Sequence, residues 1–223
     1  MIKLVIFDLD GTLLNTIDDL ADCTNYVLQK NGFPTHEVDA YKYFVGNGVV
    51  KLLERALPKD IPETTFAEIH KEFLHYYEIH KEDKTKPYAG MVETLEKLQR
   101  WGILLAVATN KPHELLPALM QRFFPTIKWV AVFGNRNGVP VKPNPQIIYD
   151  ILDTICVFSR MCVTVDETLY VGDTATDMET AHNARITKKV GALWGFRSKE
   201  ELEHANANFI IENPLEIITL IYD

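Results

Sequence analysis

The chain has 223 residues, 47% of them hydrophobic and 24% charged, which is enough for one large or two modest globular domains with a real core. Its formal net charge of −8 argues against general binding to nucleic acid or to an anionic membrane surface. No stretch approaches the roughly 18 apolar residues that a membrane span requires, so a membrane-embedded protein is not expected.

The first predicted element is a buried strand, Leu4–Phe7, which runs directly into Asp8 and Asp10. Two carboxylates at the end of an apolar strand are costly to place without a functional role. When a carboxylate is desolvated and unpaired, its pKa rises or it binds a cation. Gly11 then lets the backbone turn sharply and present its N–H groups. An ordinary strand-ending turn is the alternative, since Asp, Gly and Thr are common in turns, but the later motifs make it the weaker one.

Only helical patterns follow, from about residue 15 to residue 86. Thr16 and Asp19 resemble a helix-capping pair at the start of the first helix. A second helix is predicted over Val49–Leu57, and a third begins at Thr64, where apolar and aromatic residues repeat at helical spacing. We interpret 15–86 as a helical cap inserted into the rest of the chain.

Alternating strand and helix patterns occupy the chain after residue 87. Apolar runs, clearest in the first two ranges, predict strands at Ile103–Ala108, Thr168–Val171, Val130–Phe133, Lys189–Leu193 and Asn208–Ile211. Helical patterns lie between them at Gly90–Trp101, Asn144–Leu152 and Thr176–Ala184. This alternation predicts a doubly wound, Rossmann-like parallel α/β sheet built from 1–14 and 87–223, with the cap inserted between these two parts.

Each notable polar residue follows a predicted strand or opens a helix beside one. These residues are Asp8, Asp10, Thr109, Asn110, Lys142, Asp173 and, one helical turn further on, Asp177. Because ligands bind outside the carboxyl ends of the strands in such a sheet, we expect these side chains to converge on one cleft. Each alone is typical of a turn, an N-cap or a solvated surface residue, but their joint order favours a site.

This set of groups is suited to phosphoryl transfer. Several oxygen ligands without a nearby histidine or thiol suit Mg²⁺, which binds carboxylates together with substrate phosphate. Asp8 could then attack phosphorus and form an aspartyl-phosphate, while Asp10 protonates the leaving oxygen and later deprotonates water. The phosphate would be held by Leu9, Gly11, Thr109, Asn110 and Lys142.

Four segments resemble the motifs of the haloacid dehalogenase-like hydrolase superfamily, and within it the phosphoglycolate phosphatase-like group. They are Asp8–Leu13, Val107–Lys111, Lys142–Pro145 and Val171–Asp177. The resemblance covers nearly the whole chain and implies a nucleophile at Asp8 and an acid/base at Asp10. It also implies Mg²⁺ held by Asp8, the Asp10 carbonyl and Asp173, with Asp177 a further ligand or a partner of one. The acid at Asp10 favours phosphate ester hydrolysis, because the dehalogenase branch lacks it.

In the cap, Val45–Gly48 followed by Leu52–Leu57 is similar to the segment with which phosphoglycolate phosphatases close over their substrate. The resemblance implies that Gly46, Asn47 and Gly48 contact the substrate, and the helix start there could also hold an anion on its amides. A plain helix N-terminal turn is an equal alternative.

Two features depart from the family's usual pattern. The stretch Asp153–Glu167 is longer than expected and holds Cys156 and Cys162, while Arg185 occupies a position where the family commonly has glycine. Together with Cys23, the cysteines are odd in number and show no paired metal-ligand spacing. We therefore expect reduced thiols and a cytoplasmic protein.

The sequence thus predicts a Mg²⁺-dependent phosphatase of a small phosphorylated metabolite, with phosphoglycolate as the leading substrate. The alternatives are a sugar phosphomutase of the β-phosphoglucomutase type, a pyrophosphatase and, less favoured, a non-enzymatic phosphate-binding module. The expected partner is a small phosphate ester, without nucleic acid or membrane, and the protein would be a monomer or homodimer.

Overall fold

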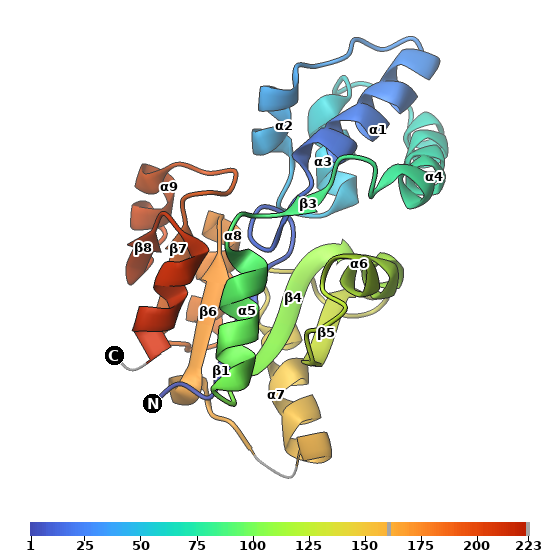
Figure 1. Cartoon of the computed structure of the whole chain (residues 1–223). Helices are drawn as coiled ribbons and strands as arrows, with labels where there is room; N and C mark the ends of the chain where they lie inside the picture. Colours follow the sequence, from blue (N-terminus) through green and yellow to red (C-terminus); the bar gives the residue numbers. More distant parts are fainter. Residues whose placement is uncertain (160–161, 222–223) are drawn as a thin grey trace.

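The computed structural model describes residues 1–159 and 162–221. Its centre is a six-stranded parallel sheet with strand order β5-β4-β1-β6-β7-β8 (Figure 1). The strands are β1 (Leu4–Phe7), β4 (Leu104–Pro112), β5 (Trp129–Asn135), β6 (Thr168–Gly172), β7 (Lys188–Ala192) and β8 (Phe209–Ile211). Every strand predicted from the sequence is present, and the doubly wound α/β fold is confirmed. Among the residues described, no helix is both long and apolar enough to cross a membrane.

Helices cover both faces of this sheet, because alternate strand residues point to opposite sides. Val5 and Phe7 of β1 share a core with α5 (Met91–Arg100), α6 (Leu116–Phe123) and the 3-10 helix η3 (Pro214–Ile221). Leu4 and Ile6 share the opposite core with α7 (Gln146–Ser159) and α8 (Ala175–Asn183). The short helices are η1 (His113–Leu115), η2 (Val165–Glu167) and α9 (Lys199–His204). Burial on both faces explains the continuous apolar run of β1.

Strand β1 lies in the middle of the sheet, with β4 on one side and β6 on the other. Phe7 pairs with Val107 of β4 and Val171 of β6, so the residues that follow these three positions reach the same edge of the sheet. The chain order reverses across β1, and a crevice opens at the carboxyl ends of the strands at such a switch point. The register therefore places the first, second and fourth motifs together.

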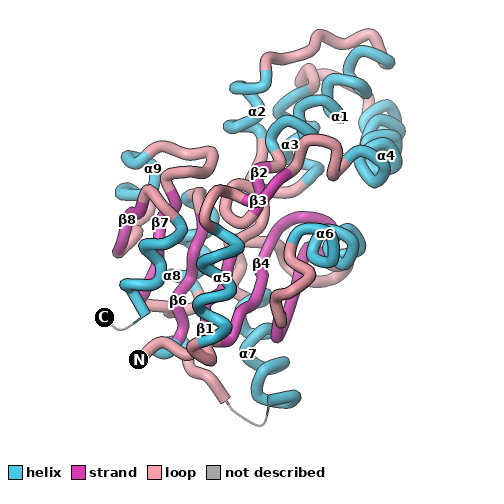
Figure 2. The backbone as a smooth tube through the Cα atoms, in the orientation of Figure 1, coloured by secondary structure: helices cyan, strands magenta, loops and turns pink. Residues whose placement is uncertain are grey.

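Four helices form the cap and pack around a separate apolar cluster, to which Leu115 and Phe196 of the core also belong. They are α1 (Ile17–Lys30), α2 (Val38–Phe44), α3 (Val49–Ala56) and α4 (Glu63–His80). The two-residue strands β2 (Leu14–Asn15) and β3 (Lys86–Pro87) pair antiparallel where the chain enters and leaves the cap (Figure 2). The assignment of 15–86 to one domain and of 1–14 with 87–223 to another stays a prediction.

Two features of the cap differ from the sequence prediction. The short helix α2 was not identified, because its only buried side chain is Tyr41 and it carries little apolar periodicity. The predicted capping pair was wrong, since Thr16 precedes α1 but its side chain makes no capping hydrogen bond. Asp19 instead accepts hydrogen bonds from the N–H groups of Lys84 and Thr85, at 2.9 and 2.8 Å. Asp19 thereby ties the last loop of the cap to its first helix.

The prediction of reduced thiols is wrong for two of the three cysteines, because Cys156 and Cys162 form a disulfide. Helix α7 and the 3-10 helix η2 cover the two ends of the long stretch Asp153–Glu167. Residues 160 and 161, which also belong to that stretch, lie outside the described residues. Cys23 is a free thiol, buried inside the cap.

Arg185 keeps the turn for which the family commonly uses glycine. Its φ of 64° lies in the left-handed region that glycine adopts at low cost. Arg185 N–H donates to the His182 carbonyl at 2.9 Å, and Ile186 N–H donates to the Ala181 carbonyl at 2.8 Å. These two bonds form a Schellman motif, which ends α8 in the usual way despite the bulky side chain.

Candidate active site

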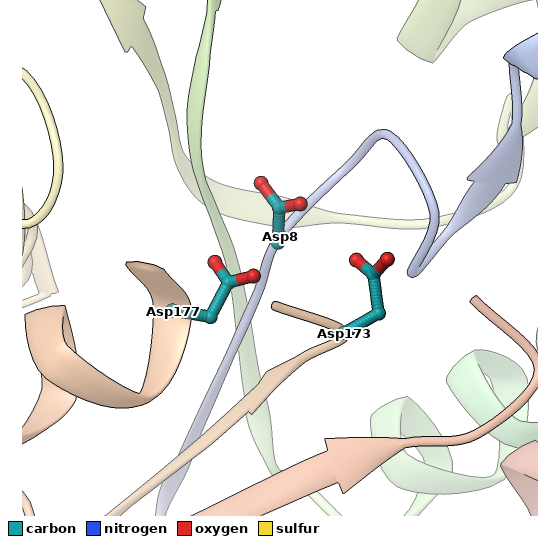
Figure 3. Close-up of side chains that lie close together, drawn as sticks. All are labelled: Asp8, Asp173 and Asp177. Carbon is teal, nitrogen blue, oxygen red and sulfur yellow. The ribbon is translucent and has the colours of Figure 1, made fainter. Parts of the chain in front are cut away.

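Three buried carboxylates meet at the carboxyl edge of the sheet (Figure 3). Asp8 follows β1, Asp173 follows β6, and Asp177 lies in the first turn of α8. An oxygen atom of each lies within 4.8 Å of the others, and all three residues are buried. We call these three residues the carboxylate cluster. The structure thus brings together three of the residues that the sequence placed at strand ends.

Asp173 is held in a fixed orientation by the loops around it. Its Oδ1 accepts a hydrogen bond from Thr12 Oγ1 and its Oδ2 accepts one from the Phe196 N–H, both at 2.9 Å. Gly11 and Gly195 approach so closely that a Cβ added to either would lie 2.3 or 2.2 Å from an Asp173 atom. These two positions therefore have no room for a side chain.

The turn after β1 uses several of its own backbone groups. The Gly11 N–H donates to the Leu14 carbonyl at 2.9 Å, and the Leu9 carbonyl accepts from the Leu13 N–H at 3.0 Å. Gly11 is therefore not a free donor for phosphate, and it contributes its φ of 92° and the space beside Asp173 instead. Among the described residues, the Leu9 N–H has no hydrogen-bond acceptor, so it remains available to a ligand.

Lys142 enters the carboxylate cluster from the loop before α7 and is only 3% exposed. Its Nζ donates to Asp8 Oδ1 and Asp177 Oδ1, both at 2.7 Å, and to the Ala108 carbonyl at 2.9 Å. The other oxygen of Asp177 accepts from Thr174 Oγ1 at 2.7 Å. Asp177 is therefore the partner that holds Lys142 against Asp8.

Burial and mutual repulsion dominate the electrostatics of the cluster. Burial, followed by the charge of Asp177, raises the pKa of Asp8 to about 7 although Lys142 opposes the shift. Burial and the charges of Asp177 and Asp8 raise the pKa of Asp173 well above its ordinary value. Burial acts to lower the pKa of Lys142, but the two aspartates outweigh it and raise that pKa. Three carboxylates beside one ammonium leave excess negative charge, and an all-oxygen donor set of this kind fits a hard divalent cation such as Mg²⁺.

Asp10 lies outside the cluster and pairs with a lysine that the sequence analysis did not select. Lys111 Nζ donates to Asp10 Oδ1 at 2.9 Å and to the hydroxyl of Tyr77, in α4 of the cap, at 2.5 Å. Burial acts to lower the pKa of Lys111, but its contacts with Asp10 and Tyr77 raise it above the ordinary value. Lys111 was quoted only as part of the second motif, and Tyr77 is indistinguishable by spacing from the other core aromatics of its helix.

Asn110 connects the core to the cap and to Lys142. Its Nδ2 donates to the carbonyls of Gly46 and Lys142, both at 3.2 Å, and its Oδ1 accepts from the Lys142 N–H at 2.9 Å. Thr109 is buried beside it, and its Oγ1 accepts from the Lys111 N–H at 3.2 Å. The second motif therefore positions the lysine of the third.

Two further contacts hold the cap loop Val45–Gly48 on the core. Asn47 Nδ2 donates to Thr176 Oγ1 of α8 at 2.9 Å, and Arg197 donates to the Val45 carbonyl at 3.0 Å. Thr176 and Arg197 were not selected from the sequence, because nothing in their surroundings marks a partner more than a hundred residues away. The cap therefore lies against the carboxyl edge of the sheet.

A cavity of about 40 Å³ lies between the core and the cap. Its lining residues are Asp8, Asp10, Thr109, Asn110, Lys111 and Pro112 from the core, and Leu20, Val45, Gly46, Gly48, Val49, Leu52 and Tyr77 from the cap. Gly46 and Gly48 line this cavity. Asn47 is absent from this lining and donates to Thr176. Contact of these three residues with substrate stays a prediction.

The chain matches the family model of the haloacid dehalogenase-like hydrolases over residues 5–190. It is 29% identical over 226 residues to the phosphoglycolate phosphatase of Vibrio parahaemolyticus, covering 99% of this chain and 96% of that protein. The phosphoglycolate phosphatase of Aliivibrio fischeri is 32% identical over 189 residues, which cover 82% of this chain and 81% of that protein.

A solved structure from Haemophilus somnus, described as a predicted phosphoglycolate phosphatase, has the same fold. Its TM-score is 0.88 at 27% identity, and the match covers 98% of this chain and 97% of that one. With the family model matching most of the chain, the resemblance seen in the motifs is confirmed. The chain belongs to the haloacid dehalogenase-like hydrolase family, in its phosphoglycolate phosphatase-like group.

Proposed function

We propose that this phosphoric monoester hydrolase releases phosphate from a small phosphorylated metabolite, with phosphoglycolate the first candidate. The observation that carries the proposal is the position of Asp8, which lines the cavity, accepts a hydrogen bond from Lys142 and lies beside Asp173 and Asp177. The relatives named phosphoglycolate phosphatase, which align over nearly the whole chain, supply the substrate candidate.

The residues that would hold Mg²⁺ are Asp8, the backbone carbonyl of Asp10, and Asp173, with Asp177 beside them. When bound, the ion would counteract the burial and the Asp177 charge that raise the pKa of Asp8, and it would offset the charge of the substrate phosphate. Asp173 suits the role of a metal ligand because both of its oxygens are oriented by neutral donors, Thr12 and the Phe196 N–H, and by no cationic side chain among the described residues.

The proposed reaction has two steps. An oxygen of Asp8 attacks phosphorus, and the bond to the leaving oxygen breaks as Asp10 gives that oxygen a proton. Asp10 then takes a proton from water, the water oxygen attacks the aspartyl-phosphate, and inorganic phosphate leaves with Asp8 restored. Lys142, Thr109 and the Leu9 N–H would stabilise the charge on the transferring oxygens.

Phosphate release from phosphoglycolate in Mg²⁺ tests the proposal. We expect EDTA to abolish it and Asp8→Asn to lower kcat by roughly 10⁴-fold or more, because a side-chain amide is a poor nucleophile. Asp60→Asn, at an exposed aspartate, is the matched control and should retain activity. Acid quenching during turnover should trap a phosphoryl group on the peptide that contains Asp8. Full activity in Asp8→Asn would exclude Asp8 as the nucleophile.

The sugar phosphomutase and the phosphatase differ in where the phosphoryl group goes, because a mutase returns it to a second hydroxyl of the sugar. Formation of glucose 6-phosphate from glucose 1-phosphate would identify a mutase. A cytoplasmic location, a monomeric or homodimeric state and the absence of nucleic-acid binding stay predictions, and the disulfide removes one argument for the first of them.

A further inference from the structure

A buried cation lines the active-site cavity. Among the residues that line it, Lys111 is the one with a cationic side chain, and the cap contributes mainly apolar groups such as Leu20 and Leu52. Lys111 is 4% exposed and its ammonium lies 2.9 Å from Asp10. Because Asp10 is the proposed proton donor to the leaving oxygen, Lys111 lies on the side of the cavity that the leaving group would occupy.

Two hydrogen-bond donors at this position lack an acceptor. The ammonium of Lys111 has three N–H groups, and within residues 1–159 and 162–221 its acceptors are Asp10 and the Tyr77 hydroxyl. That hydroxyl accepts from Lys111, but it donates to no described residue although Tyr77 is only 1% exposed. A buried donor without an acceptor is costly, and here two such donors lie on atoms 2.5 Å apart, in two residues that line the same cavity.

We propose that Lys111 and Tyr77 together bind a carboxylate on the leaving group, so that the enzyme selects small acidic phosphate esters over neutral ones of the same size. The inference rests on the proposed phosphatase function and assigns its substrate class. A carboxylate has two acceptor oxygens and a negative charge, which match one O–H donor and one ammonium N–H. Lys111 comes from the core and Tyr77 from the cap, so the complete pair forms only when the cap lies on the core.

The test compares phosphoglycolate with hydroxyethyl phosphate, in which a neutral CH₂OH group replaces the carboxylate. For the wild-type protein, kcat/KM should favour phosphoglycolate by roughly 10- to 150-fold, the value of one charge-assisted hydrogen bond. Lys111→Met should bring this ratio close to one, and Tyr77→Phe should lower it by about fivefold. Any loss that comes from disturbing Asp10 affects both esters and therefore cancels in the ratio.

Tyr41→Phe is the matched control for Tyr77→Phe. Tyr41 is also a buried cap tyrosine with one hydrogen bond, to Asn25 at 2.7 Å, but it lies outside the cavity lining. The control should leave the substrate ratio unchanged. An equal loss on both esters in Lys111→Met and Tyr77→Phe would overturn the inference and leave the phosphatase proposal intact. No phosphate release from either ester by the wild-type protein would overturn both.

Discussion

At Asp8 the fold favours one protonation state and the proposed reaction requires the other. Burial and the neighbouring Asp177 favour the protonated carboxyl, whereas nucleophilic attack requires the carboxylate. Lys142, 2.7 Å away, opposes the shift but does not cancel it. A bound cation would resolve the conflict, so the pKa of Asp8 provides a way to detect metal binding without any assay of turnover.

Asp8→Asn should therefore stabilise the metal-free protein increasingly as the pH rises. The pKa of Asp8 is about 7 in the fold against an ordinary 3.8, so its contribution to stability is fully present below about pH 4 and is lost as the pH rises through 7. Asparagine does not ionise and has no such loss. Urea unfolding in EDTA, at about pH 5 and about pH 8, should show the variant gaining on the wild type by an amount on the order of a few kcal/mol.

A stability difference that stays constant with pH would contradict the raised pKa. Saturating Mg²⁺ provides the complementary measurement, because it should raise the melting temperature of the wild type more at the higher pH. The same addition should have little effect on Asp8→Asn, which has lost one of the proposed ligands.

Single residues were predictable where their neighbours in the sequence determine their position. Asp8 and Asp173 directly follow buried strands, so parallel pairing alone brings them to one edge of the sheet. Lys111 and Tyr77 were not predictable, because their contact joins a strand end to a helix in the cap and depends on how the cap sits.

At the scale of elements, the cap loop Val45–Gly48 connects the cap to the core through hydrogen bonds. Its similarity to a substrate-closing segment suggested contact with the ligand, and Gly46 and Gly48 do line the cavity. Asn47 instead donates to Thr176 of α8 and accepts from Arg55 of α3 at 2.7 Å. The loop thus links a cap helix to a core helix.

Breaking the Asn47–Thr176 hydrogen bond should weaken closure of the cap. We expect Asn47→Ala and Thr176→Val each to raise KM for phosphoglycolate about fivefold, the value of one ordinary hydrogen bond, with a smaller change in kcat. The double variant should be no worse than Asn47→Ala alone, since Thr176→Val removes only a bond that Asn47→Ala has already removed. Additive losses would show that the two residues act separately.

Elements were predictable where periodicity was strong. The strands β1 and β6 are continuous apolar runs, and α4 repeats its aromatic residues over many turns. The short helix α2 was missed because it is held by tertiary packing of Tyr41 and Phe44 and has little apolar periodicity of its own. The turn at Arg185 is the opposite case. An arginine disfavours the left-handed backbone found there, yet both Schellman hydrogen bonds form.

For the whole molecule, the number of reactive thiols before and after unfolding gives a direct test of the fold. Burial raises the pKa of Cys23 to about 12, and its side chain is enclosed in the core of the cap. We expect a thiol reagent at about pH 8 to find no reactive cysteine in the native protein, because the thiolate is the reactive form. Unfolding should expose one thiol, and reduction of the unfolded chain should raise the number to three. Three thiols before reduction would contradict the disulfide.

The paired strands β2 and β3 bring the two ends of the cap together. Leu14 pairs with Pro87 and Asn15 with Lys86, so the cap leaves and rejoins the core at neighbouring positions on paired strands. A tight two-residue turn could close that gap, because antiparallel neighbours lie only about 5 Å apart. Such a shortened chain would retain Asp8, Asp10, Lys142 and Asp173 but would lose Tyr77. The sheet would then carry the machinery for phosphoryl transfer, and exchanging the insert would change which esters it accepts while leaving the chemistry the same.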